Sequence, residues 1–118
     1  MKDLQPLSGV TKSHVTLAEA LSAIPYGSGK AFATVMMHGS LEVEIYAPRG
    51  HDPQTPHSRD EVYVIMRGSG YFVHGSTREP FSTGDVLFVP AGAEHRFVEF
   101  SDDFITWVFF YGPEGGEK

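Results

Sequence analysis

The stretch that decides the fold reads GHDPQTPHSRDEVYVIMRG and covers residues 50–68. It places His57 four residues before Glu61 and then continues into an apolar run at 62–66. On a straight strand, side chains four residues apart share one face but lie roughly 13 Å apart. Two ligands of one metal ion must each lie about 2 Å from it. His57 and Glu61 can therefore share an ion only if the chain turns between them, and the small or polar residues 58–60 favour a tight corner there.

A second stretch, GDVLFVPAGAEH at residues 84–95, has the same shape. A Gly-Asp turn leads into a short apolar strand, a Pro-Ala-Gly corner follows, and the next strand opens with His95. The two stretches together offer two imidazoles and one carboxylate. Such a set leaves coordination positions open, as in non-haem iron centres and similar divalent metal sites.

These two stretches resemble the paired motifs of the cupins, G-x5-H-x-H-x3,4-E-x6-G and G-x5-P-x-G-x2-H-x3-N. In the first motif His57 matches the second histidine, Glu61 the glutamate and Gly68 the closing glycine. In the second motif the matching residues are Gly84, Pro90, Gly92 and His95. The resemblance covers residues 50–99 and implies an all-β, cupin-type double-stranded β-helix, which is a jelly-roll barrel.

The sequence also departs from the cupin motifs. Thr55 stands where the first histidine is expected, Gly50 is one place out of step, and Glu99 replaces the closing asparagine. Cupins generally hold their metal with three histidines and one glutamate, so one usual ligand is missing. Water, substrate, Gln54 or His51 are the candidates for that position.

Length and composition set the limits of the function. The 118 residues predict one domain, with an arm carrying a short helix at 1–30, a β-barrel at 31–112 and a flexible tail at 113–118. The net charge of −6 argues against nucleic acid or an anionic membrane as partner. There is no cysteine, no secretory signal and no run of about 20 apolar residues, so we expect a cytoplasmic protein.

Local patterns predict the individual elements. Thr16 and Glu19 have the spacing of a capping box before an apolar helix at 17–24. Alternation over 40–47 predicts a half-buried strand whose Glu42 and Glu44 are solvated, unless their face lines a polar cavity. The strand at 71–74 is expected to form a hairpin with the strand at 62–66.

Parity along the strands predicts which side chains accompany the metal ligands. Tyr63 and Ile65 share the face of Glu61, and Phe97 and Glu99 share the face of His95. Glu99 would then either lie past the rim of the barrel or transfer protons. The candidate substrate-contacting residues are Tyr63, Ile65, Phe97 and Trp107.

Both faces of the last strand, residues 104–111, are apolar or aromatic, so the sequence does not say which one faces inward. Burial of both faces suggests that the outer one meets a second copy of the chain, and we expect a homodimer.

The cupin resemblance implies a choice among dioxygenases, isomerases, decarboxylases, lyases and small-molecule binders. We interpret the chain as a metal-dependent, dioxygenase-like enzyme that acts on a small organic molecule. Its ion, which could be iron, manganese, nickel or zinc, would be held by His57, Glu61 and His95, while Tyr63 or Glu99 moves protons. The alternative is a non-catalytic small-molecule-binding module whose metal is structural or absent.

Overall fold

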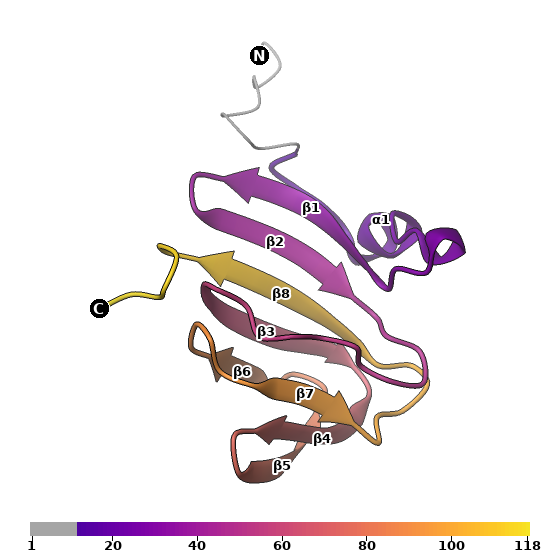
Figure 1. Ribbon diagram of the computed structural model, residues 1–118. Helices are drawn as coiled ribbons and strands as arrows, with labels where there is room; N and C mark the ends of the chain where they lie inside the picture. The colour runs from indigo at the N-terminus through magenta and orange to yellow at the C-terminus, as the bar shows by residue number, and fades with distance from the viewer. Residues whose placement is uncertain (1–11) are drawn as a thin grey trace.

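The structure is a computed structural model that describes residues 12–118 as one short α-helix, a 3₁₀ turn and two antiparallel β-sheets (Figure 1). The five-stranded sheet has the order β1-β2-β8-β3-β6, and the three-stranded sheet has the order β5-β4-β7. The strands are β1 (Phe32–His38), β2 (Leu41–Tyr46), β3 (Asp60–Arg67), β4 (Ser69–His74), β5 (Thr77–Ser82), β6 (Val86–Val89), β7 (His95–Val98) and β8 (Ile105–Tyr111). The all-β barrel with an N-terminal helix that the sequence predicts is confirmed.

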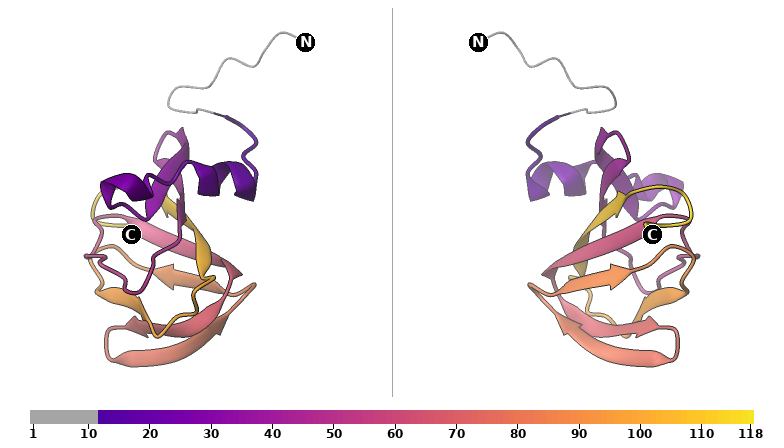
Figure 2. Two further views of the ribbon diagram at one scale, coloured as in Figure 1. Left: turned by 90° about the vertical axis from the view of Figure 1, so that its right-hand side faces the viewer. Right: turned by 90° about the vertical axis from the view of Figure 1, so that its left-hand side faces the viewer.

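The helix α1 (Leu17–Ser22) begins where the sequence predicts and ends two residues earlier. Thr16 accepts a hydrogen bond from the Glu19 amide at 3.1 Å, and the Glu19 carboxylate accepts one from the Thr16 amide at 2.9 Å. This reciprocal pair is the capping box. The helix lies outside the barrel beside β1 (Figure 2), where its buried Ala20 joins a cluster with Ile45 and Ile105.

The connection from β3 to β4 crosses from one sheet to the other. β3 pairs with β6 and β8, whereas β4 pairs with β5 and β7, so the hairpin predicted between β3 and β4 is wrong. Gly68 makes the crossing with φ of 96°, and a Cβ there would lie 2.7 Å from Phe104 Cα. The chain needs glycine at this point because both the backbone angle and the space exclude a side chain.

The inward face of β2 is its polar face. Tyr46 belongs to the central core, while Ile45 packs outside with α1. By alternation Glu42 and Glu44 therefore point to the interior side, so the expectation that they are solvated is wrong and the alternative is right. Both line pockets at the mouth of the barrel.

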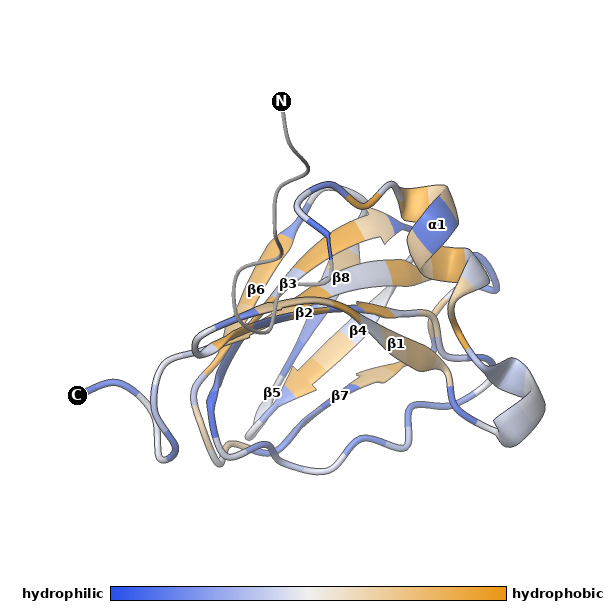
Figure 3. Cartoon of the chain, turned by 90° about the horizontal axis from the view of Figure 1, so that it is seen from above, coloured by the Kyte–Doolittle hydropathy of each residue, from blue (hydrophilic) through white to orange (hydrophobic). Residues whose placement is uncertain are grey.

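The structure also decides which face of β8 is internal. Val108 and Phe110 belong to the central core, together with Phe104 just before the strand. Ile105 and Trp107 pack on the opposite side, against the helix cluster. The outer face of β8 is thus covered in part by the chain's own helix. In Figure 3 the apolar residues gather on the strands and on α1, while the connecting loops are more hydrophilic.

The C-terminal tail, residues 113–118, makes hydrogen bonds to the barrel. The Gly115 amide donates to the Ser58 carbonyl at 2.7 Å, and the Glu117 amide donates to Asp60 Oδ2 at 2.8 Å. These bonds attach the tail to the corner between His57 and Glu61. Over residues 12–118, the structure has no helix long and apolar enough to span a membrane.

Candidate metal centre

The two sheets bring three ligand-type side chains to one point inside the barrel. His57 ends the loop before β3, Glu61 lies on β3 of the larger sheet, and His95 opens β7 of the smaller one. One potential ligand atom from each residue lies within 4.8 Å of the others. The chain bends at Ser58 and Arg59, which is the corner that the sequence predicts.

Hydrogen bonds donated by backbone amides join the two corners that carry the histidines. The Gly92 amide donates to the His57 carbonyl at 2.7 Å, and the Ala91 amide donates to Asp60 Oδ1 at 2.9 Å. Asp60 therefore holds the second corner through one oxygen and the C-terminal tail through the other. Hydrogen bonds from the Glu117 amide and then the Ala91 amide lower the pKa of Asp60. We call the hydrogen bonds that Asp60 accepts from Ala91 and Glu117 the Asp60 latch. This latch holds the corner between His57 and Glu61 against the corner that leads to His95.

Contacts around its ring fix the orientation of His95. Its Nδ1 donates to the Ala93 carbonyl at 3.0 Å, which leaves Nε2 facing Tyr63 Oη at 3.0 Å and Glu61 Oε1 at 3.3 Å. Burial lowers the pKa of His95, but the Glu61 carboxylate and the Ala93 carbonyl outweigh it, and the net pKa is raised. A proton on Nε2 then occupies the direction in which a metal ion would bind.

Glu61 is the strongest sign of a cation at this point. Its side chain is 1% exposed, and neither carboxylate oxygen has a hydrogen-bond partner in the described part of the chain. A buried carboxylate without donors is costly, so such groups are usually paired or bound to a metal. Two imidazoles and one carboxylate this close together suit a divalent transition metal. The residues therefore fit such an ion.

The missing fourth ligand is not replaced by a free side chain in this arrangement. Thr55 and His51 are exposed and lie outside the three-residue cluster. Gln54 approaches the site, but its Oε1 accepts from Tyr63 Oη at 2.8 Å and its Nε2 donates to Asp52 Oδ2 at 3.0 Å. Both ends of the amide are thus occupied.

Sequence reasoning missed Asp52, the buried residue that anchors this loop. Its carboxylate accepts from the Tyr46 hydroxyl, from both nitrogens of Gln54 and from the Phe97 amide at 2.8 Å. A continuous chain of contacts then runs from Tyr46 through Asp52, Gln54 and Tyr63 to His95. An aspartate in a loop shows no periodicity, so no local signal could have identified this role.

Tyr63 stands beside the cluster, as parity predicts. Its side chain is fully buried, and burial, followed by the nearby Glu61 charge, raises its pKa well above the usual value. Ile65 and Phe97 also face the interior, but both are core residues, each 1% exposed.

Two other candidate site residues lie elsewhere. Glu99 follows the end of β7 with φ of 51°, so strand parity no longer holds, and its exposed side chain pairs with Arg78. It therefore lies past the rim, the first of the two positions expected from the sequence. Trp107, expected to contact substrate, faces away from the cluster and packs outside the barrel near α1.

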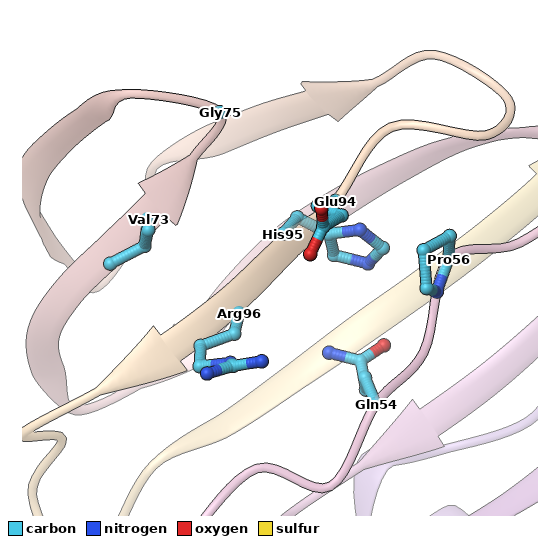
Figure 4. A pocket seen from close by; sticks show the side chains of 7 residues that line it. All are labelled: Gln54, Pro56, Val73, Gly75, Glu94, His95 and Arg96. Carbon is cyan, nitrogen blue, oxygen red and sulfur yellow. The ribbon is translucent and has the colours of Figure 1, made fainter.

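Pockets reach the cluster on the His95 side and on the His57 side. Figure 4 shows one of about 320 Å³, in which Gln54 and Pro56 stand opposite His95 and its neighbours Glu94 and Arg96. A second, of about 300 Å³, lies between the start of β1, β2 and the loop at 53–57, and it reaches His57.

Known proteins share this architecture. Residues 42–111 match the model of the cupin domain family. An uncharacterized protein of Streptomyces coelicolor is 33% identical over 86 residues, which are 71% of this chain and 82% of that protein. A cupin 2 conserved barrel domain protein from Salinispora arenicola superposes with a TM-score of 0.59 at 24% identity, covering 69% of this chain and 74% of that one.

Two further solved structures share the fold at lower identity. The DMSP lyase DddQ of Ruegeria pomeroyi has a TM-score of 0.60 at 22% identity, covering 84% of this chain and 55% of that one. KdgF from Halomonas sp. has a TM-score of 0.59 at 16% identity, covering 70% of this chain and 80% of that one. Such identities establish the fold alone. The family match spans more than half of the sequence, and the chain belongs to the cupin domain family.

Proposed function

We propose that this protein binds one divalent transition metal ion through His57, Glu61 and His95 and is a metal-dependent enzyme acting on a small organic molecule. The observation that carries the proposal is the Glu61 carboxylate, which is 1% exposed and lies 3.3 Å from an imidazole nitrogen. The part of the chain that the structure describes offers it no hydrogen-bond donor. A cation there would satisfy all three side chains at once.

Only three protein ligands would hold the ion, because the exposed Thr55 stands where the cupin motif has its first histidine. The coordination position of that histidine is then open to substrate. When bound, a divalent ion would polarise an oxygen of the substrate, and iron would add the electron transfer that a dioxygenase-like reaction needs. The pockets on either side of the cluster supply the entrances.

Tyr63 is the proton-transfer group of the proposed enzyme. Its hydroxyl lies 3.0 Å from His95 Nε2 and donates to Gln54 Oε1 at 2.8 Å. The raised pKa keeps the phenol protonated at neutral pH, so it acts as an acid or a hydrogen-bond donor to a group bound beside the metal. Gln54 orients the hydroxyl, and Asp52 orients Gln54.

Elemental analysis of the purified protein tests the metal assignment. We expect near-stoichiometric metal in the parent and loss of metal in His57→Ala and His95→Ala, while His38→Ala, which changes an exposed histidine, retains it. A parent that stays metal-free after incubation with iron, manganese, nickel and zinc would show that the assignment is wrong.

The same samples separate the enzyme from the non-catalytic binding module, the second candidate. This alternative is favoured by the complete hydrogen bonding of Gln54 and Asp52, which gives a formed interior without an ion. Turnover in a screen of small organic acids, alcohols and amines, reduced by Tyr63→Phe with metal content unchanged, supports the enzyme. A ligand retained through purification and recovered unaltered supports the binding module.

A further inference from the structure

The pocket of about 300 Å³ beside His57, here called the His57 pocket, has mostly apolar walls and contains one carboxyl group without an assigned task. Ala31, Phe32, Pro53 and Val108 contribute the apolar lining. A cavity of about 300 Å³ with apolar walls and few polar groups is typical of small-molecule sites. The pocket in Figure 4 is instead bordered by Glu94, Arg96 and the amide of Gln54.

Most polar groups of the His57 pocket already have partners. The Tyr46 hydroxyl is bonded to Asp52, and the Gln54 amide is bonded to Tyr63 and Asp52. Lys30 is exposed and lies 5.9 Å from the centre of the Phe32 ring. Water screens an exposed charge far more than a buried one. His57 belongs to the three-residue cluster and Thr55 carries no charge, so Glu44 is the ionisable group that remains.

Glu44 has no ion pair with a lysine or arginine among residues 12–118. Arg59, the cation closest along this mouth, pairs with Glu42 at 3.0 Å and also bonds the Ser40 carbonyl. The Thr34 hydroxyl lies 3.1 Å from Glu42 but 3.5 Å from Glu44. When Glu42 and Glu44 are both ionised, this mouth therefore carries one negative charge more than Arg59 balances.

Burial and neighbouring acids make this excess charge unfavourable. Burial, then Glu42 and Glu61, raises the pKa of Glu44 to about 8, so the protein without ligand keeps a proton there at neutral pH. The charged and polar groups around it from other elements are Thr34 on β1, the exposed Lys30 before β1, His57 and Arg59 in the corner, and Glu114 in the tail. A bound cation can replace that proton.

We propose that the pocket between β1, β2 and the loop at 53–57 binds a small organic cation, with its positive group at Glu44 and its apolar part against Phe32, Tyr46 and Val108. The aromatic rings of Phe32 and Tyr46 favour a cation as well as an apolar group. As a statement about substrate class, this rests on the proposed function, because the pocket opens onto His57. As a statement about binding, it holds with or without a metal.

Isosteric probes test the proposal. Isothermal titration calorimetry would compare choline, its neutral carbon analogue 3,3-dimethylbutan-1-ol and the anion 3,3-dimethylbutanoate, on EDTA-treated and on zinc-loaded protein. We expect choline to bind at least roughly tenfold more tightly than the neutral probe. Glu44→Gln should reduce this ratio to about one, while Glu79→Gln, on exposed β5, should leave it unchanged.

A second readout follows from the displaced proton. At pH 7, titrations in two buffers of different ionisation heat should show that choline binding releases close to one proton from the parent and almost none from Glu44→Gln. Ala31→Leu narrows the pocket while keeping the carboxyl, so it should weaken both choline and the neutral probe equally.

The proposal is overturned if the neutral or anionic probe binds as tightly as choline, if no probe binds, or if Glu44→Gln keeps the cation preference. These outcomes are independent of the metal assignment, since the metal content of each sample is measured separately. Cation preference in a protein that takes up no metal would uphold this inference while rejecting the proposed function.

Discussion

Replacing Glu61 by glutamine should stabilise the metal-free protein and remove its response to metal. Glutamine has the same shape, so the core around this 1% exposed side chain stays filled. Above the raised pKa of His95, Nε2 carries no proton and faces a carboxylate oxygen at 3.3 Å, so two acceptors oppose each other. The amide of Gln can donate to Nε2 instead.

We expect the free energy of unfolding to rise by about 1–2 kcal/mol in Glu61→Gln. This is the net contribution of a buried hydrogen bond that leaves no partner unpaired. For a chain of 118 residues this corresponds to roughly 3–10 °C in Tm. The stability advantage of Glu61→Gln over the parent should become smaller as the pH falls towards 6. Because the folded-state pKa of His95 is raised, its ion pair with Glu61 stabilises the parent fully below the ordinary histidine pKa of 6.5. This stabilisation is lost as the pH rises through the folded-state pKa.

The metal response should change in the opposite direction. An ion at about 100 times its Kd stabilises the parent by about 2.7 kcal/mol, whereas Glu61→Gln should show almost no shift. Calorimetric melting at pH 9 in EDTA, and at pH 7.5 with and without zinc, measures both effects, with Glu79→Gln as the exposed control. If Glu61→Gln is less stable than the parent at pH 9, the carboxylate has a structural partner and the reasoning is refuted.

Four further predictions concern the latch, the sheet crossing, the pocket acid and the outer face. Asp60→Asn should weaken metal binding and expose the tail to carboxypeptidase, because one of its two amide contacts is lost; equal metal affinity and equal trimming would contradict the latch. Gly68→Ala should lower Tm more than Gly75→Ala, since a Cβ at Gly68 meets Phe104 Cα at 2.7 Å and one at Gly75 meets nothing within 4 Å; similar melting of the two variants would argue against the close crossing. The raised pKa of Glu44 implies a contribution to stability that is fully present below about pH 4.5 and is lost as the pH rises through about 8. Denaturant titration between pH 5 and 9 should therefore show a smaller decline in the free energy of unfolding for Glu44→Gln than for the parent. Parallel stability curves for the two proteins would exclude this role. We propose that two copies of the chain form a dimer through edge strand β6, where Phe88 is 51% exposed. Light scattering should then show a monomer for Phe88→Lys and a dimer for the control Glu79→Lys. A monomeric parent protein would reject the dimer.

The sequence predicted the fold class and the three residues that meet in the cluster because both depend on short-range patterns. The glycine and proline corners place His57, Glu61 and His95 just after turns, and the capping box of Thr16 and Glu19 begins the helix as expected. Turn chemistry and strand alternation act over a few residues, so a single sequence displays them directly.

Local patterns failed where a decision depended on contacts between distant segments. The predicted β3–β4 hairpin was wrong because β3 instead pairs with β8, more than forty residues further along the chain (Asp60↔Tyr111, Tyr63↔Val108). Trp107 and Val108 have similar apolar neighbours in the sequence, and only the position of α1 decides that Trp107 lies outside the barrel.

By itself, the sequence determined an all-β barrel with two histidines and a glutamate at its corners. Tertiary structure alone decided that Asp52 anchors the loop beside Glu61. It also decided that, among residues 12–118, Glu61 has no hydrogen-bond donor and the inward-facing Glu44 has no lysine or arginine partner. The physical reason is that burial and hydrogen-bond satisfaction depend on which strands and loops surround a side chain. Those neighbours are assembled from across the chain when the two sheets close around the site.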